Sequence, residues 1–374
     1  MRLRTILILS LLFVAATPAS AHSDKRKEKG RGPKVERTIA TEANVAVSAC
    51  LISGRVRVRG WDRNEVRARS SEAAEIQFRR EGEGPDTRLA RKVELLIADE
   101  AQGTAHARSC ESFSEIELDV PRGATVQLQT RDSDIEVADV AIVYVSTQNG
   151  DVSIERATKA VDAGTIGGGI SLQDSSGTIS LHSAGGNIDA GNVRPAQAGD
   201  IFEARSLAGD ITLEGISHGQ LKARTLNGSL CATGPLAKGG RYDLQTISGD
   251  LTLTLPENSS FRVTAKFSQG ADVISDFPLT LSNLGSAPAD PSPRTPAPPA
   301  DPARKPDPMP KPEPASAPTP QDEIPPTVTK LKKDKHGRTV VATFALRRVE
   351  GVYGSGDAFM DLSSFSGTIH LRKQ

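Results

Sequence analysis

The chain has 374 residues, a formal net charge of +0, and 25% charged, 37% hydrophobic and 4% aromatic residues. This length suits one large domain or two ordinary ones. The neutral charge argues against a nucleic-acid-binding protein, because such domains are usually strongly basic. The three cysteines are too few for a disulfide-dense miniprotein or a multi-cysteine zinc module.

The N-terminus has the pattern of a secretory signal peptide. Arg2 and Arg4 precede an apolar run over residues 6–16, and Ala19-Ser20-Ala21 follows it. This A-x-A site predicts cleavage after Ala21, so residues 1–21 are expected to be the signal peptide. We therefore expect an extracytoplasmic protein, in the periplasm, at the cell surface or secreted. No later apolar run approaches the roughly 20 residues of a membrane helix, so no integral membrane segment is expected after cleavage.

Export would place the cysteines in an oxidising compartment. Cys50 and Cys110 flank the first strand-rich segment and form the candidate disulfide, which leaves Cys231 as the odd cysteine. The sequence also allows the other two pairings, or three free thiols.

Two segments cannot contribute to a folded core. Residues 22–34 carry six Lys or Arg and almost no apolar residue, which predicts a flexible basic arm. Residues 286–326 hold 16 of the 24 prolines, and because proline lacks a backbone donor we predict a disordered, semi-stiff insertion there. Residues 35–285 are then the first part of one β-domain, and residues 327–374 are C-terminal strands that complete it.

A short block recurs along the chain: Ser or Thr, two residues, Gly, one residue, then apolar-x-apolar. Its glycines are at positions 150, 168, 177, 186, 209, 228, 249, 356 and 367; the Gly177 block begins with Asp174 instead of Ser or Thr, and the Gly356 block, YGSGDAFM, is a looser match. Outside the proline-rich segment they are 9–11 or 18–23 residues apart, which indicates units of roughly ten residues. Self-similarity at such a period is typical of a solenoid.

The second and fourth residues after each block glycine are apolar, as in Val152 and Ile154 or Ile211 and Leu213. This alternation predicts strands with one row of side chains inward. Glycine suits the corner before each strand because it adopts positive φ without a clash. We predict an all-β protein, a parallel β-solenoid with coils of about 20 residues. Residues 35–145 are expected to form an atypical N-terminal β-rich cap, and a β-sandwich is the alternative fold.

The order of several motifs resembles the bacterial "putative adhesin" family of domains of unknown function. They are SGRVRVRGWDRNEVRARS, VELLIADE, LDVPRGATVQLQTRDSDIEVADV, the Gly blocks and the closing SFSGTIHLRKQ. The resemblance covers most of residues 45–280 and 340–374. It implies an exported, Gly-rich parallel β-solenoid at the cell envelope without established catalytic residues. Some similar proteins are linked with envelope-stress regulation.

Four acidic residues directly follow a block glycine: Asp151, Asp210, Asp250 and Asp357. A polysaccharide-active β-helix enzyme would need two such carboxylates close together, or a set of acidic oxygens that binds Ca²⁺. Turn chemistry is the preferred interpretation, because Asp readily hydrogen-bonds the backbone at turns. Among the six scattered histidines, His182 and His218 are expected at the surface of strands or turns.

We therefore predict no catalytic residue, no cofactor and no metal. The expected function is that of a non-catalytic, envelope-associated protein, adhesin-like or structural, whose partner is an envelope glycan or an envelope protein. The proline-rich segment would add reach or a docking strip for a proline-recognising partner. A polysaccharide-active enzyme and an accessory protein of envelope-stress regulation are the alternatives.

Overall fold

A computed structural model describes residues 35–70, 75–81, 89–98, 115–268, 272–281, 329–333, 339–343 and 348–374. The signal peptide (1–21), the basic arm (22–34) and the proline-rich segment (286–326) lie outside the described residues and stay predictions. Every regular element in the described ranges is a β-strand. These ranges contain no helix long and apolar enough to cross a membrane.

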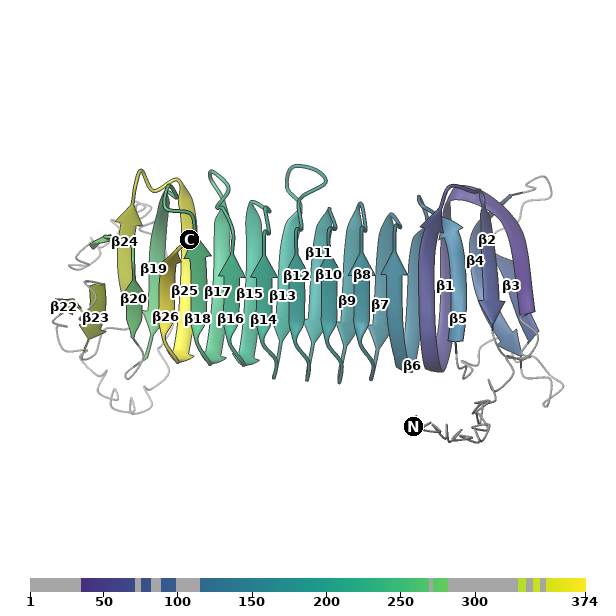
Figure 1. Ribbon diagram of the computed structural model, residues 1–374, viewed down its shortest axis with the longest axis horizontal. Helices are drawn as coiled ribbons and strands as arrows, with labels where there is room; N and C mark the ends of the chain where they lie inside the picture. Colours follow the sequence, from purple (N-terminus) through teal and green to yellow (C-terminus); the bar gives the residue numbers. More distant parts are fainter. Residues whose placement is uncertain are drawn as a thin grey trace, which may run out of the picture.

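The strands form two rows, and the coils stack along the long axis of the molecule (Figure 1). Each central coil contributes a longer strand to the first row and a shorter strand to the second. The first row contains β7 (Ile142–Thr147), β9 (Ala160–Thr165), β11 (Thr178–Ser183), β13 (Ile201–Ser206), β15 (Gln220–Asn227) and β17 (Arg241–Ser248). The second row contains β8 (Val152–Glu155), β10 (Ile170–Gln173), β12 (Ile188–Gly191), β14 (Ile211–Glu214), β16 (Leu230–Thr233) and β18 (Leu251–Leu255).

Neighbouring coils pair in parallel and in register. In the second row, Ile170 is opposite Val152 of the preceding coil and Ile188 of the following coil. The first row is built in the same way, from β7–β9 through β15–β17. This stacking confirms the predicted parallel β-solenoid and excludes the β-sandwich, whose neighbouring strands would run antiparallel.

The predicted alternation places the apolar side chains inside the solenoid. Six of these side chains in the second row are at most 2% exposed: Val152, Ile154, Ile170, Leu172, Ile211 and Leu213. The polar residues between them, such as Ser171 and Thr212, face outward. Full burial of each Val, Ile or Leu contributes about 1.5–3 kcal/mol. Because every coil repeats this burial against its neighbours, the solenoid gains stability coil by coil.

The N-terminal end is a cap in which antiparallel pairs interrupt the repeat. β1 (Val35–Trp61) spans both rows and pairs in parallel with β4, β5 and β6. β2 runs antiparallel to β1 and β5, and β3 runs antiparallel to β4. The bounds of these strands are β2 (Glu65–Ser70), β3 (Glu75–Glu81), β4 (Ala90–Ala98), β5 (Glu115–Pro121) and β6 (Thr125–Ala138). The predicted atypical cap is therefore present.

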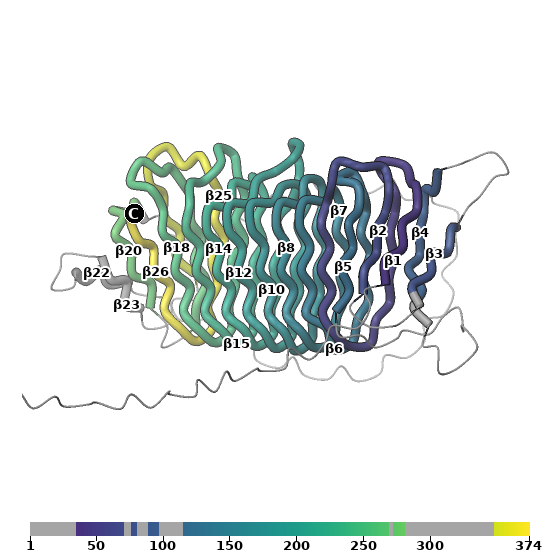
Figure 2. The backbone as a smooth tube through the Cα atoms, turned by 45° about the vertical axis from the view of Figure 1, so that its right-hand side comes forward, coloured from purple at the N-terminus to yellow at the C-terminus, as the bar shows by residue number. Residues whose placement is uncertain are grey.

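At the C-terminal end, the last strands of the chain lie between coils that precede them in sequence. β25 (Ala358–Ser366) pairs with β17 on one side and with β19 (Phe261–Phe267) on the other. β26 (Ile369–Lys373) lies in the same way between β18 and β20 (Val273–Ser275). Figure 1 shows these yellow strands among green ones, and Figure 2 shows the same interleaving. Four further strands complete this end: β21 (Thr280–Leu281), β22 (Thr329–Lys333), β23 (Thr339–Thr343) and β24 (Arg348–Tyr353).

One corner of the solenoid is a stack of glycines at positions 150, 168, 186, 209, 228, 249 and 367. A Cβ atom added to Gly186 would lie 2.0 Å from the carbonyl oxygen of Gly168. Gly150 has a φ of 119°, but Gly186 is not in the positive-φ region. Close approach of the backbones, rather than the positive φ that the sequence suggested, therefore requires glycine at position 186. Gly177 and Gly356 belong to other turns, so their two blocks are not members of this stack.

A buried hydroxyl accompanies each glycine of this corner. Ser183 Oγ donates to the carbonyl oxygen of Gly168 in the preceding coil at 2.9 Å, and it accepts the N–H of Gly186 at 2.9 Å. Ser206 makes the same two contacts one coil further along. The hydroxyl satisfies two buried backbone groups that the corner leaves outside the sheet pairing. This requirement explains why the repeated block begins with Ser or Thr.

Candidate functional site

Three of the four candidate acids lie in one ladder beside the glycine corner. Asp151, Asp210 and Asp250 each accept a hydrogen bond from the backbone of the next coil. Their donors are the N–H groups of Gly169, Ser229 and Thr368, respectively, at 2.7–2.8 Å. The carboxylates thus complete the backbone pairing at the turn, in agreement with the turn interpretation. They are also separated along the ladder by coils with Gly169, Asn187 or Ser229 at this position, so they do not converge.

The fourth candidate, Asp357, belongs to a different turn near the C-terminal end. Its carboxylate accepts a hydrogen bond from the Ser355 hydroxyl at 2.7 Å, and this contact lowers the pKa of Asp357. Nowhere in the described ranges do three or more His, Cys, Asp or Glu side chains gather closely enough to hold a metal ion. The arrangement of the acids therefore gives no support to acid–base chemistry on a polysaccharide.

The two histidines singled out in the sequence have different environments. His182 faces outward from β11, and its Nε2 is 2.8 Å from Ser180 Oγ. His218, in contrast, is fully buried, so its predicted surface position is wrong. Its Nε2 is 2.7 Å from the carbonyl oxygen of Gly177, and its ring packs edge-on against Phe202. Desolvation lowers the pKa of His218, so the ring is neutral at pH 7.

Two of the three cysteines, Cys50 and Cys231, lie in the described residues. Cys50, in β1, is disulfide-bonded, and Cys231, on the outer side of β16, is a free thiol. Cys110 lies outside the described residues, so the pairing of Cys50 with Cys110 stays a prediction. Burial raises the pKa of the Cys231 thiol, with a further contribution from Asp210. A raised thiol pKa is typical of an unreactive cysteine.

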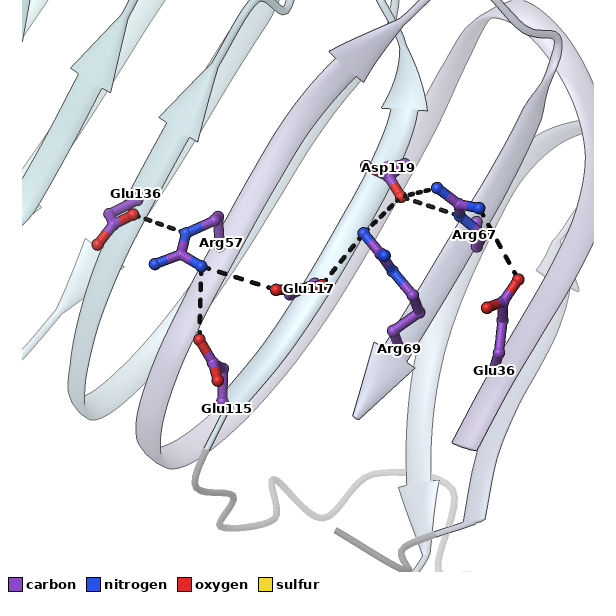
Figure 3. Close-up of polar contacts among 8 residues, drawn as sticks. All are labelled: Glu36, Arg57, Arg67, Arg69, Glu115, Glu117, Asp119 and Glu136. Carbon is purple, nitrogen blue, oxygen red and sulfur yellow. Dashed lines mark hydrogen bonds and ion pairs between the residues drawn. The ribbon is translucent and has the colours of Figure 1, made fainter. Parts of the chain in front are cut away.

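The N-terminal cap carries a dense network of ion pairs on its outer face (Figure 3). Arg67 and Arg69 of β2 both contact Asp119 of β5, at 2.8 and 3.1 Å. Arg57 of β1 contacts Glu136 of β6 at 2.8 Å. The remaining acids of the network, Glu36, Glu115 and Glu117, also contact these arginines. This network joins β1, β2, β5 and β6, and each charged side chain in it already has a partner within the protein.

A second polar surface lies over the outer face of β15, β17, β25 and β19, near the C-terminal end. It is a depression of about 550 Å³, which we call the Phe359 depression. Two rows of outward side chains line it, each row running across the four strands. The first row is Gln220, Arg241, Phe359 and Arg262. The second row is Lys222, Asp243, Asp361 and Thr264.

The Phe359 depression combines an exposed aromatic ring with positive charge. Phe359 is 48% exposed although it lies in the middle of a sheet. The Arg262 guanidinium is 5.9 Å from the centre of its ring, in cation–π geometry. In the described residues, Lys222, Arg241 and Arg262 form no ion pair with a carboxylate. A planar apolar surface beside unpaired cations and the Gln220 amide is suited to binding a polar ligand.

Sequence reasoning did not find this site, because Phe359 is 97 positions from Arg262 and 118 positions from Arg241 in the chain. Phe359 belongs to the YGSGDAFM block, where it occupies the outward position between two apolar residues. An aromatic residue at a position that is mostly polar in the other blocks was the available signal. Its cationic neighbours could not be inferred, because no local pattern shows that β25 lies between β17 and β19.

The in-register stacking and the buried inner rows define the protein as a parallel β-solenoid. Residues 62–282 match the family model described as Toastrack DUF4097. This match covers more than half of the chain, so the chain belongs to the Toastrack DUF4097 family, in agreement with the resemblance that the motifs carried. No match was found among curated proteins.

One solved structure was also similar. It is described as "a putative cell adhesion protein from Clostridium sporogenes ATCC 15579", determined at 1.95 Å resolution. The sequence identity is 10%, the TM-score is 0.17, and the alignment covers 91% of this chain and 100% of that chain. A TM-score this low does not establish a shared fold.

Proposed function

We propose that this protein is a non-catalytic, adhesin-like interaction protein that works outside the cytoplasm. Its solenoid presents a long outer face to an envelope glycan or an envelope protein. The observation that carries this proposal is the Phe359 depression, an open concave surface with an exposed ring and unpaired cations on a rigid sheet. The predicted signal peptide supports a location outside the cytoplasm.

The contacts of the candidate acids favour binding over catalysis. The carboxylates of Asp151, Asp210 and Asp250 are engaged by backbone N–H groups at the corner, which lies away from the Phe359 depression. Within that depression, Asp243 and Asp361 are each paired with a cation. These carboxylates therefore already have protein partners, whereas glycoside cleavage requires a pair of carboxyl groups that faces the substrate.

The proposal can be tested with purified residues 22–374 on a glycan array and in a cell-wall pull-down. A matched protein that lacks residues 286–326 shows whether the proline-rich segment contributes. We expect saturable binding without released oligosaccharide. Loss of binding after the deletion would assign the contact to the proline-rich segment instead of the solenoid face. Released oligosaccharide, or no binding to any envelope fraction, would overturn the proposal.

A further inference from the structure

We propose that the Phe359 depression binds an acidic polysaccharide, with one sugar ring stacked on Phe359 and its carboxylate held by the arginines on either side. This inference deepens the proposed function, on which it rests, by naming the ligand class and the residues that recognise it.

The register of the sheet carries the first step. Arg241 of β17 is opposite Phe359 of β25, and Phe359 is in turn opposite Arg262 of β19. Adjacent strands are about 4.8 Å apart, so the Cα atoms of the two arginines lie on either side of Phe359, roughly 10 Å from each other. The Arg262 guanidinium already lies over one face of the ring. A sugar that stacks on the other face of the ring therefore has the Arg241 side chain on one neighbouring strand and Arg262 on the other. Guanidinium groups bind carboxylates through paired hydrogen bonds.

The distribution of charge carries the second step. The two carboxylates of the second row, and one on each of the two flanking strands, are each paired with a cation. Asp243 accepts from Arg224 at 2.6 Å, and Asp361 accepts from Lys266 at 3.0 Å. On the flanking strands, Glu203 pairs with Arg205, and Glu350 pairs with Arg348. The acids near the depression are thus neutralised from outside it, whereas Lys222, Arg241 and Arg262 are left to attract an anion.

The backbone around the depression favours a saccharide over an acidic peptide. β15, β17, β25 and β19 are all paired on both sides, so they offer no sheet edge to which a peptide strand could be added. The depression instead offers an exposed ring, the Gln220 amide and the Thr264 hydroxyl. These side-chain groups are suited to sugar faces and sugar hydroxyls.

The direct test measures binding of oligogalacturonate by isothermal titration calorimetry. The methyl-esterified form of the same oligosaccharide is the matched ligand, because it keeps the sugar rings and loses the charge. Alginate and hyaluronate oligosaccharides extend the panel of acidic probes. We expect the charged form to bind at least about tenfold more tightly than its ester, with an affinity that falls as salt is added.

Variants on the outer face separate the two parts of the site. Arg241→Gln and Arg262→Gln should each weaken binding of the acidic form about tenfold and leave the ester unchanged. Phe359→Ala should weaken binding of both forms. Phe365→Ala removes a ring that is even more exposed (64% against 48%) from the same strand, outside the depression. Arg194→Gln removes a remote exposed charge. Both of these variants should bind like the unmodified protein, and circular dichroism checks that all variants are folded.

The inference and the proposed function fail in different ways. If acidic probes bind no better than neutral ones while envelope glycans still bind, the acidic ligand is wrong and the proposed function stands. The site would also be refuted if the Arg241→Gln and Phe359→Ala variants bound the acidic form as tightly as the unmodified protein does. If no envelope fraction and no probe binds, both the inference and the proposed function are wrong.

Discussion

At the scale of single residues, the repeated block is explained by two demands of one corner. The glycines must let the backbone of one coil touch the carbonyl group of the previous coil, and the hydroxyls must satisfy the polar groups buried there. Gly186 and Ser183 show both demands in the same coil. Each instance of the block that lies in this stack therefore carries the same residue types for the same physical reason.

Replacement of a corner glycine should therefore be severe. In Gly186→Ala the new Cβ atom would lie 2.0 Å from a backbone oxygen, which cannot move without displacing the neighbouring coil. We expect the free energy of unfolding, measured by urea denaturation, to fall by about 3 kcal/mol. Gly219→Ala is the matched control, because a Cβ atom there meets nothing within 4 Å. Its effect should stay within about 1 kcal/mol, and equal losses in the two variants would contradict the steric explanation.

The buried His218 should make the protein less stable in acid. Its pKa is lowered in the folded state by desolvation, so below its ordinary value of 6.5 the unfolded chain binds more protons than the folded one. The stabilisation by the neutral ring is therefore complete above pH 6.5 and is lost as the pH falls towards the folded-state pKa. This loss amounts to at most about 1.4 kcal/mol per pH unit.

The measurement compares urea unfolding of the unmodified protein and of His218→Gln at pH 7.5 and pH 5.5. Both proteins contain the same carboxylates, so the difference between their pH dependences reports the histidine. We expect a shallower loss of stability in the variant. Parallel pH profiles would show that the pKa of His218 is the same in the folded and the unfolded protein.

At the scale of elements, the C-terminal end is organised around the coil formed by β25 and β26. This coil is inserted between β17 and β18 on one side and β19 and β20 on the other. Leu362 is fully buried in β25 and lies opposite Leu244 on one side and Ala265 on the other. Leu362→Asp would place an unpaired charge between the two neighbouring strands, at a cost of several kcal/mol. Ser363→Asp is the matched control, because it adds the same charge to the outer side of the same strand.

We expect Leu362→Asp to raise hydrogen exchange in β17, β19 and β25, while β8, β10 and β12 keep their protection. The reason is that each coil of a solenoid is stabilised mainly by its immediate neighbours. Ser363→Asp should leave the exchange pattern unchanged. Uniform loss of protection along the whole chain in Leu362→Asp would show that the solenoid unfolds as one cooperative unit.

The elements also show what could be predicted from the sequence. The period of the blocks and the alternation around Val152 and Ile154 were sufficient to predict parallel strands and an inward row, because both depend on local residue order. The position of β25 was not predictable. The block YGSGDAFM, whose last three residues begin β25, resembles the other blocks, and nothing within it indicates that β25 pairs between β17 and β19 rather than after them.

At the scale of the whole molecule, the candidate site follows from this arrangement of coils. The Phe359 depression exists because insertion of β25 brings Phe359 between Arg241 and Arg262. Three of the four candidate acids, Asp151, Asp210 and Asp250, are corner residues that accept hydrogen bonds from backbone N–H groups. Sequence motifs could therefore predict the solenoid, but they could not predict which outward side chains its coils bring together.

The most direct test of the account is a titration of the protein with acidic oligosaccharide from the cell envelope, with reducing ends assayed in the same samples. The unmodified protein should bind saturably and release no new reducing ends. The Phe359→Ala, Arg241→Gln double variant should be folded and should not bind. Binding that is unchanged in this variant, or reducing ends that accumulate with the unmodified protein, would contradict the account.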